Sequence, residues 1–174
     1  MVRTSYAIAL GSNRRSRHGS PAGTLRAALA ALGAGEVSTI RHTPALGPAG
    51  RGFANAVAIV ESELDPDLLL AELKAIERAF GRRAGRRWGP RVLDLDIILW
   101  SGGAWGGPGP ILPHPEFRER AFVLQPLAEL IPDWRDPLTG LSVRQLLARL
   151  TAPRPIRRCG QGRAHSSVGR ATDF

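Results

Sequence analysis

Residues 86–100 read RRWGPRVLDLDIILW, and this stretch decides the fold. In its second part, VLDLDIIL at 92–99, an apolar run is interrupted by two aspartates that one leucine separates. Successive side chains of a strand point to opposite faces, so Asp94 and Asp96 share one face. The neighbouring apolar residues share the other face, which we expect to meet helices: Leu93, Leu95 and Ile97.

Working outward, periodicity and turn residues predict the elements that precede this strand. They are a strand at 5–10, a helix from Pro21 that stops at Gly33, strands at 36–42 and 53–62, and a helix that starts at Asp65-Pro66 and ends by Gly81. The resulting order, β-α-β-β-α-β, is the ferredoxin-like plan. We therefore expect an α+β fold: a four-stranded antiparallel sheet with two helices on one face, plus C-terminal additions.

The chain has 174 residues, which favours a single domain, expected at 1–151. The segment 152–174 is polar and aperiodic and carries five arginines against one aspartate, which predicts a disordered tail. Its SSVGRA run, back-translated with suitable codons, resembles the D-arm of a transfer-RNA gene. Our hypothesis is that the reading frame runs into such a gene, and the genomic sequence beneath codons 164–174 tests it.

The net charge is +9, and all but one of the 24 basic residues are arginines. Arginine suits phosphate binding, but a GC-rich genome also explains the excess. No apolar run approaches the length of a membrane span, and the N-terminus does not have the pattern of a secretory signal. The single cysteine, Cys159, excludes an internal disulfide and a Cys-rich zinc site. We expect a cytoplasmic enzyme, favoured as a monomer, with no membrane or nucleic-acid partner.

Two neighbouring acids on one strand face repel each other unless a cation lies between them. Magnesium takes hard oxygen ligands, commonly one or two carboxylates together with substrate phosphates. Six arginines between positions 78 and 91 lead into the same strand, and a polyphosphate with its metal would neutralise both signs. A wet strand face and a solvated basic loop are the alternatives. The sequence contains no P-loop, no H-E-x-x-H and no G-x-S-x-G motif.

With these motifs in hand, the chain resembles the 6-hydroxymethyl-7,8-dihydropterin pyrophosphokinase family of folate biosynthesis. RWGPRVLDLDII at 87–98 looks like the family signature. Further segments agree in order over roughly residues 5–150: ALGSN at 9–13, TPALGP at 43–48, FANAV at 53–57, LLAELKAIERAFGR at 69–82 and PHPEFRERAFVLQPLAEL at 113–130. The family's α+β, ferredoxin-like fold agrees with the order of elements above.

The resemblance implies that ATP donates its β,γ-pyrophosphoryl group to the hydroxymethyl oxygen of the pterin and that AMP leaves. It implies that Asp94 and Asp96 bind two Mg²⁺ ions, and that Arg82 and Arg91 act on the triphosphate beside them as catalytic residues. The register of Arg83 and Arg87 in the arginine loop stays open. The implied ATP-binding set is Glu77, Arg82, Arg87, Arg91, Ile97, His114 and Arg120.

The resemblance also implies a pterin site. The backbone of a loop would recognise the pterin edge, Asn55 would offer it a donor and an acceptor, and two phenylalanines would stack on the ring. The loop is Thr43, Pro44, Ala45 and Leu46, and the rings are Phe53 and Phe122. Phenylalanines on strands are more commonly core residues, and an asparagine at a strand start is commonly a turn residue.

The chain departs from the family pattern at a few positions. Pro110 and Leu112 stand where some relatives have an arginine and a threonine that contact ATP, Arg41 stands for a frequent aromatic residue, and Ala45 for a frequent proline. Two hypotheses from other classes also remain. The same plan serves RNA-binding modules, although their aromatic signature is missing here, and the arginines of a plain interaction domain would be a docking patch.

Overall fold

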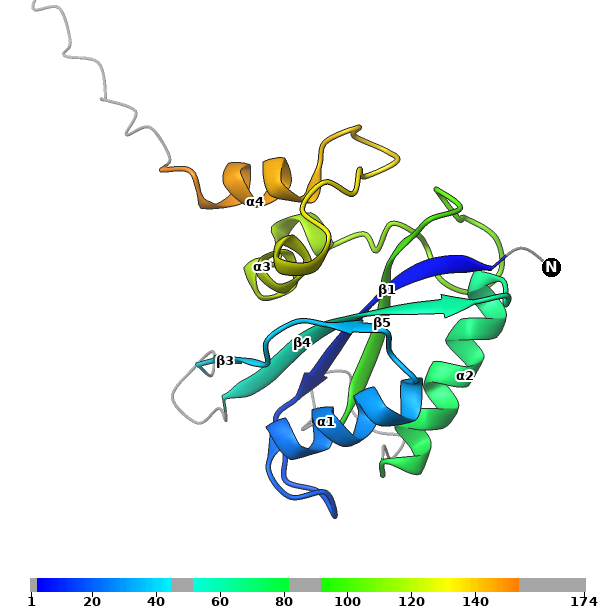
Figure 1. The fold of residues 1–174 in the computed structure, drawn as a ribbon, viewed down its shortest axis with the longest axis vertical. Coiled ribbons are helices and arrows are strands. Elements are labelled where there is room, and N and C mark those ends of the chain that lie inside the picture. Colours follow the sequence, from blue (N-terminus) through cyan, green and yellow to red (C-terminus); the bar gives the residue numbers. More distant parts are fainter. Residues whose placement is uncertain (1–2, 45–51, 82–91, 154–174) are drawn as a thin grey trace, which may run out of the picture.

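The computed structural model describes residues 3–44, 52–81 and 92–153 (Figure 1). The expected tail from 154 onward therefore lies outside the described residues. So do these predicted site residues: Ala45, Leu46, Arg82, Arg87 and Arg91.

In chain order the elements are β1 (Thr4–Ser12), α1 (Pro21–Leu32), β2 (Glu36–Val37), β3 (Arg41–Thr43), β4 (Phe53–Ser62), α2 (Pro66–Ala79), β5 (Asp94–Trp100), the 3-10 turn η1 (Phe117–Glu119), α3 (Ala121–Leu130) and α4 (Val143–Thr151). Each predicted helix and strand is present. None of the helices in the described ranges is long and apolar enough to cross a membrane.

The strand predicted at 36–42 is two short strands, β2 and β3. Between them, Ser38 donates its backbone N–H to the Val57 carbonyl at 2.9 Å, but its side-chain Oγ accepts the Val57 N–H at 2.9 Å. A side chain thus replaces one backbone group of the ladder. The pairing with β4 resumes at Arg41, which lies opposite Asn55. The prediction of one continuous strand was wrong because a hydroxyl can take over a ladder bond.

The sheet is antiparallel with the order β2-β4-β1-β5, and β3 also pairs with β4. Helices α1 and α2 cover one face, as predicted (Figure 1). That core contains Leu93, Leu95 and Ile97, which confirms the predicted apolar face of β5. The core lies between the helices and the alternate residues of β1 and β4 that point the same way.

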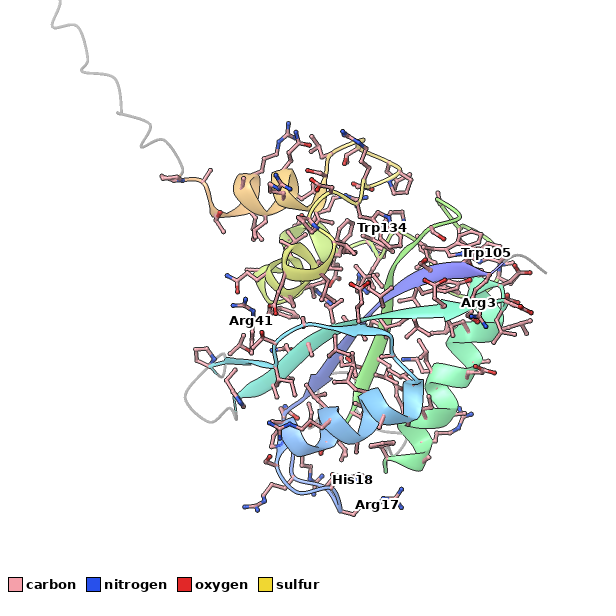
Figure 2. The ribbon with its side chains drawn as sticks, in the orientation of Figure 1. Arg3, Arg17, His18, Arg41, Trp105 and Trp134 are labelled. Carbon is pink, nitrogen blue, oxygen red and sulfur yellow. The ribbon has the colours of Figure 1, made fainter. Side chains whose placement is uncertain are left out.

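The C-terminal additions cover part of the opposite face. Helices α3 and α4 and the turn η1 pack there on Ala7, Val57, Ile98 and Leu99. Figure 2 shows Trp134 in this helical layer and Trp105 at the far end of the sheet. The layer reaches as far as the row of Val57, so the polar residues further along the strands lie beyond it.

Candidate functional site

A row of register partners crosses four strands beyond the α3 layer. Asn55 lies opposite Arg41 on one side and Gly11 on the other, and Gly11 lies opposite Asp94. Directly opposite residues in antiparallel strands share a face. Because strands are about 4.8 Å apart, Asn55 and Asp94 stand roughly 10 Å from each other. Gly11 places no side chain between them, so the part of the row from Asn55 to Asp94 forms a floor with an amide at one end and a carboxylate at the other.

The amide end of the floor is ordered by Thr43. Asn55 is only 7% exposed, and its Nδ2 donates to the Thr43 Oγ1 at 2.9 Å. Phe53 pairs with Thr43 and is half-buried. The predicted pterin residues Thr43, Asn55 and Phe53 are thus brought together where β3 meets β4, and Pro44 follows directly in the chain.

Phe122 comes from a different layer, the first turn of α3, where it is 41% exposed. The Arg120 guanidinium lies over its ring at 5.9 Å from the centroid. An exposed phenylalanine held near a cation is not a core residue, which sets Phe122 apart from Phe117, whose side chain is fully buried.

The carboxylate end consists of Asp94 and Asp96, which lie opposite Gly11 and Ala9 on the same face and are both partly exposed. Burial, reinforced by the negative charge of Asp94, raises the pKa of Asp96, against the opposing charge of Lys74. The two carboxylates repel each other, and a divalent cation between them would relieve that repulsion. Within the described ranges no group of three or more His, Cys, Asp or Glu side chains is placed to hold a metal ion.

Glu77 of α2 is fully buried, and its side chain points at the outer edge of β5. Its Oε1 accepts the backbone N–H of Leu95 at 2.8 Å and the Lys74 ammonium at 2.8 Å. Lys74 also donates to the Leu95 carbonyl at 3.2 Å. Both outward backbone groups of Leu95 are therefore bonded by α2, and this contact fixes the position of the strand that carries both aspartates. A direct nucleotide contact by Glu77, as predicted, stays a prediction.

A pocket of about 340 Å³ opens beside this edge of β5. Its walls come from α2, from β5 and from the segment that follows it: Leu70, Lys74, Asp96, Ile97, Gly109, Pro110, Ile111, His114 and Pro115. The Ile97 side chain belongs to the core. Ile97 is nevertheless one of the residues that line the pocket, at the point where the pairing of β5 with β1 shifts register.

His114 borders the pocket with a defined tautomer. Its backbone N–H donates to the Ile98 carbonyl at 2.9 Å, and its Nδ1 accepts the Glu116 N–H at 3.2 Å. Burial lowers the pKa of His114, although the nearby Asp96 charge opposes this. A neutral ring whose Nδ1 is an acceptor carries its proton on Nε2, so it can donate one hydrogen bond to a ligand. Arg120, which caps α3, forms an ion pair with Glu116.

Some residues of this site were not among those predicted. Gly11 was predicted to lie in a turn after the strand at 5–10, which was wrong because β1 continues to Ser12. A glycine inside a strand signals close approach of a ligand or another backbone. Lys74 has the helical spacing to Glu77 that predicts an ion pair, but nothing local shows that it borders a pocket. Of the predicted residues, the structure gathers Asp94, Asp96, Ile97 and His114 on one side and Thr43, Asn55 and Phe53 on the other.

Comparison with known proteins shows which family the chain resembles. A family model described as 7,8-dihydro-6-hydroxymethylpterin-pyrophosphokinase (HPPK) matches residues 7–132. The chain is 40% identical over 146 residues to a 2-amino-4-hydroxy-6-hydroxymethyldihydropteridine pyrophosphokinase of Methylorubrum extorquens, covering 82% of this chain and 91% of that protein. It is also 40% identical over 114 residues to the Synechocystis protein of the same name, covering 64% of this chain and 58% of that protein.

Solved structures resemble the fold as well. The wild-type Plasmodium falciparum HPPK-DHPS matches with a TM-score of 0.61 at 12% identity, over 85% of this chain and 45% of that chain. The chain thus spans less than two thirds of the Synechocystis relative and less than half of the Plasmodium protein.

Proposed function

The chain belongs to the 7,8-dihydro-6-hydroxymethylpterin-pyrophosphokinase family, and from this premise we propose that it transfers pyrophosphate from ATP to 6-hydroxymethyl-7,8-dihydropterin, in folate biosynthesis. The products are AMP and the pterin diphosphate. The observation that carries the proposal is the row Asn55–Gly11–Asp94, because the Asn55 amide and the Asp94 carboxylate share one face of the sheet and the residue between them is a glycine.

The pterin is assigned to the Asn55 end. The pterin ring system is nearly flat, and Gly11, which has no side chain, would leave room for it to lie on the sheet. One N–H of the Asn55 Nδ2 is bonded to Thr43, which fixes the amide, and we assign the amide carbonyl and the second N–H to the edge of the ring. Phe53 and Phe122 approach from β4 and α3 and would stack on the ring, while Thr43, Pro44, Ala45 and Leu46 would contact its edge.

ATP is assigned to the pocket at the β5 edge. A flat heterocycle that accepts and donates hydrogen bonds along one side would suit a strand edge, and the pocket lies beside β5 at Ile97. The pocket is bordered by Asp96 and His114, so a nucleotide whose base lies there has its phosphates directed toward the aspartates. We assign four arginines to the phosphates of ATP: Arg82, Arg87, Arg91 and Arg120. Of these, Arg82 and Arg91 would also act in catalysis.

Asp94 and Asp96 would hold two Mg²⁺ ions, which would neutralise the triphosphate and align it for in-line attack. The fit rests on hard oxygen donors, a shared face and the raised pKa of Asp96, all of which favour a bound cation. The protein's own part is to fix both acids, and it does so through the Glu77 contact with the Leu95 backbone.

The alternative of an RNA-binding module is not favoured. Such a module stacks bases on the aromatics of an open sheet face, whereas here the α3 layer covers part of that face and two aspartates occupy the rest. We further propose that the protein acts in the cytoplasm, as a monomer, on two small molecules, ATP and the reduced pterin.

The test is pterin-dependent release of AMP. Purified protein is incubated with ATP and Mg²⁺, with and without the reduced hydroxymethylpterin, and nucleotides are separated by ion-exchange chromatography. AMP that forms only with both pterin and metal supports the proposal. Formation of ADP, or of AMP without pterin, contradicts it. An RNA-binding or docking protein gives neither nucleotide.

A further inference from the structure

A fully buried carboxylate lies outside the site, in the loop between α3 and α4. Asp136 accepts two bonds from the Arg118 guanidinium, from Nε at 2.7 Å and from Nη2 at 2.8 Å. The Thr139 hydroxyl donates to it at 2.5 Å, and the Leu138 N–H donates at 3.1 Å. This carboxylate lies beyond residue 132, where the family match ends. Among the described residues, its hydrogen bonds come from Arg118, Leu138 and Thr139, none of which is assigned to the pterin site or the ATP pocket.

What Asp136 holds is the segment that carries two predicted ATP contacts. Arg118 lies in η1 and stacks on the buried Phe117 ring at 4.7 Å. The backbone of η1 bonds in both directions, from the Phe117 N–H to the His114 carbonyl and from the Arg120 N–H to the Phe117 carbonyl. A bidentate arginine–carboxylate pair is directional as well as strong. Its loss would leave the stretch from His114 to Arg120 with the buried Phe117 ring and its backbone bonds to β5 and α3, but without its side-chain bonds to the α3–α4 loop.

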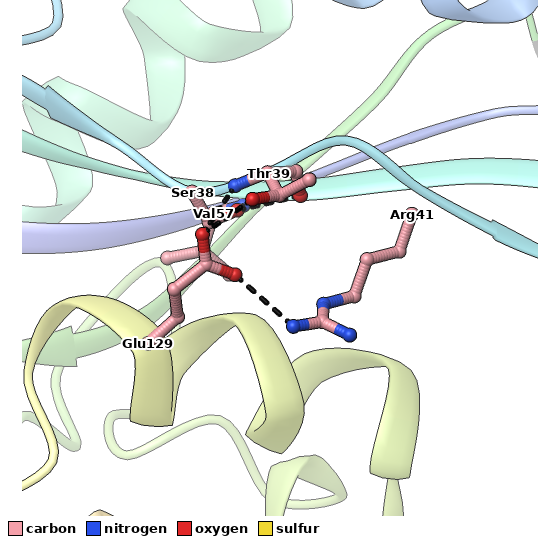
Figure 3. A network of polar contacts seen from close by, with 5 residues as sticks. All are labelled: Ser38, Thr39, Arg41, Val57 and Glu129. Atoms are coloured by element: carbon pink, nitrogen blue, oxygen red, sulfur yellow. Dashed lines mark hydrogen bonds and ion pairs between the residues drawn. The ribbon is translucent and has the colours of Figure 1, made fainter.

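A second carboxylate holds the opposite side of the site from the same helical layer. Glu129 of α3 accepts the Thr39 N–H at 2.8 Å and the Thr39 hydroxyl at 2.6 Å, and it pairs with Arg41 at 3.2 Å (Figure 3). Figure 2 also shows Arg41 of β3 beside α3. β3 spans only Arg41–Thr43 at the sheet edge, so its ladder with β4 is short, and it carries the Thr43 that orients Asn55.

We infer that Glu129 and Asp136 are positioning residues: the α3–α4 layer braces the pterin side of the site through Glu129 and the ATP side through Asp136. This deepens the proposed function and rests on it. Neither residue contacts a substrate. Each acts by fixing a short segment, η1 or β3, that the sheet and core hold incompletely.

The experiment compares steady-state kinetics of the wild-type protein with Asp136→Asn and Glu129→Gln. Asp136→Asn is expected to raise KM for ATP about tenfold and to change KM for the pterin less than twofold. Glu129→Gln is expected to do the opposite, raising KM for the pterin about fivefold and leaving KM for ATP within twofold. A role in overall stability alone would lower Tm and move neither KM selectively, so this split distinguishes the two roles.

The matched control is Asp133→Asn. Asp133 lies in the same loop as Asp136 and forms an exposed ion pair with Arg144 of α4, so its loss should change neither KM. If Asp136→Asn does not fold, Thr139→Val removes a single bond to Asp136 and should raise KM for ATP alone. Folded variants whose KM values for ATP and for the pterin both match those of the wild type overturn the inference. A wild-type protein that forms no AMP overturns the proposed function and the inference together, whereas active protein with unchanged variants overturns only the inference.

Discussion

Adding one methyl group to the floor of the site should weaken the use of the pterin without lowering the stability of the fold. In Gly11→Ala the new Cβ would lie 3.6 Å from the Asn55 Oδ1, which is ordinary van der Waals contact. Replacing a strand glycine whose backbone suits any residue stabilises a protein by about 0.4–1 kcal/mol, because the unfolded chain loses freedom. Tm should therefore stay unchanged or rise slightly.

The same methyl group would stand about 1.5 Å above the backbone, in the space assigned to the flat pterin. Misplacing a substrate by about 1 Å can cost a hundredfold in rate. We expect KM for the pterin to rise about 10- to 100-fold, with KM for ATP within twofold because its pocket lies at the far edge of β5.

The assay combines thermal unfolding with AMP release at varied pterin concentration. Gly35→Ala is the matched control, since its Cβ meets only the Ile59 carbonyl at 4.0 Å and lies away from the site. An unchanged KM for the pterin in Gly11→Ala would show that the ring does not lie on this floor. A marked fall in Tm would show that the methyl group is not accommodated, contrary to the spacing above.

Three further predictions concern single side chains. Asp94→Asn or Asp96→Asn should lower kcat at least about 100-fold in the AMP assay at saturating Mg²⁺, because charge in the transition state would lose its metal; unchanged turnover would remove both residues from the metal site. Glu77→Gln should lower the free energy of unfolding by about 3 kcal/mol in urea titrations, whereas the exposed Glu72→Gln on the same helix should have little effect, and equal losses would contradict a bracing role for Glu77. Burial works to raise the pKa of Asp136, but the bonds from Arg118, Thr139 and Leu138 outweigh it and hold that pKa below its ordinary value. Its stabilisation is therefore present above the unfolded pKa of about 3.9 and is lost as the pH falls through the folded pKa. The Tm gap between the wild type and Asp136→Asn should be constant from pH 7 to about 4 and close below that, and a gap that closes already by pH 5 would contradict the assignment.

Local patterns in the chain were sufficient for the layer of α1 and α2 and for the long strands β1, β4 and β5. Alternation around Asp94 and Asp96 predicted both faces of β5, and apolar spacing with turn residues predicted both helices of the first layer in their correct order. These features depend on neighbours within a few residues, whose side-chain directions the backbone repeat fixes. The family likewise followed from ordered short motifs.

Only the folded structure decided which of these pieces meet. The row of Asn55, Gly11 and Asp94 depends on the register of three strands, and the burial of Glu77 depends on the outward-facing backbone of Leu95. Ser38 divides a predicted strand because its hydroxyl finds Val57 across the sheet, and Asp136 and Glu129 find partners 18 and 90 residues away. Such pairings are absent from any local pattern, since a side chain's hydrogen-bond partner is chosen by packing, which brings together groups that are remote along the chain.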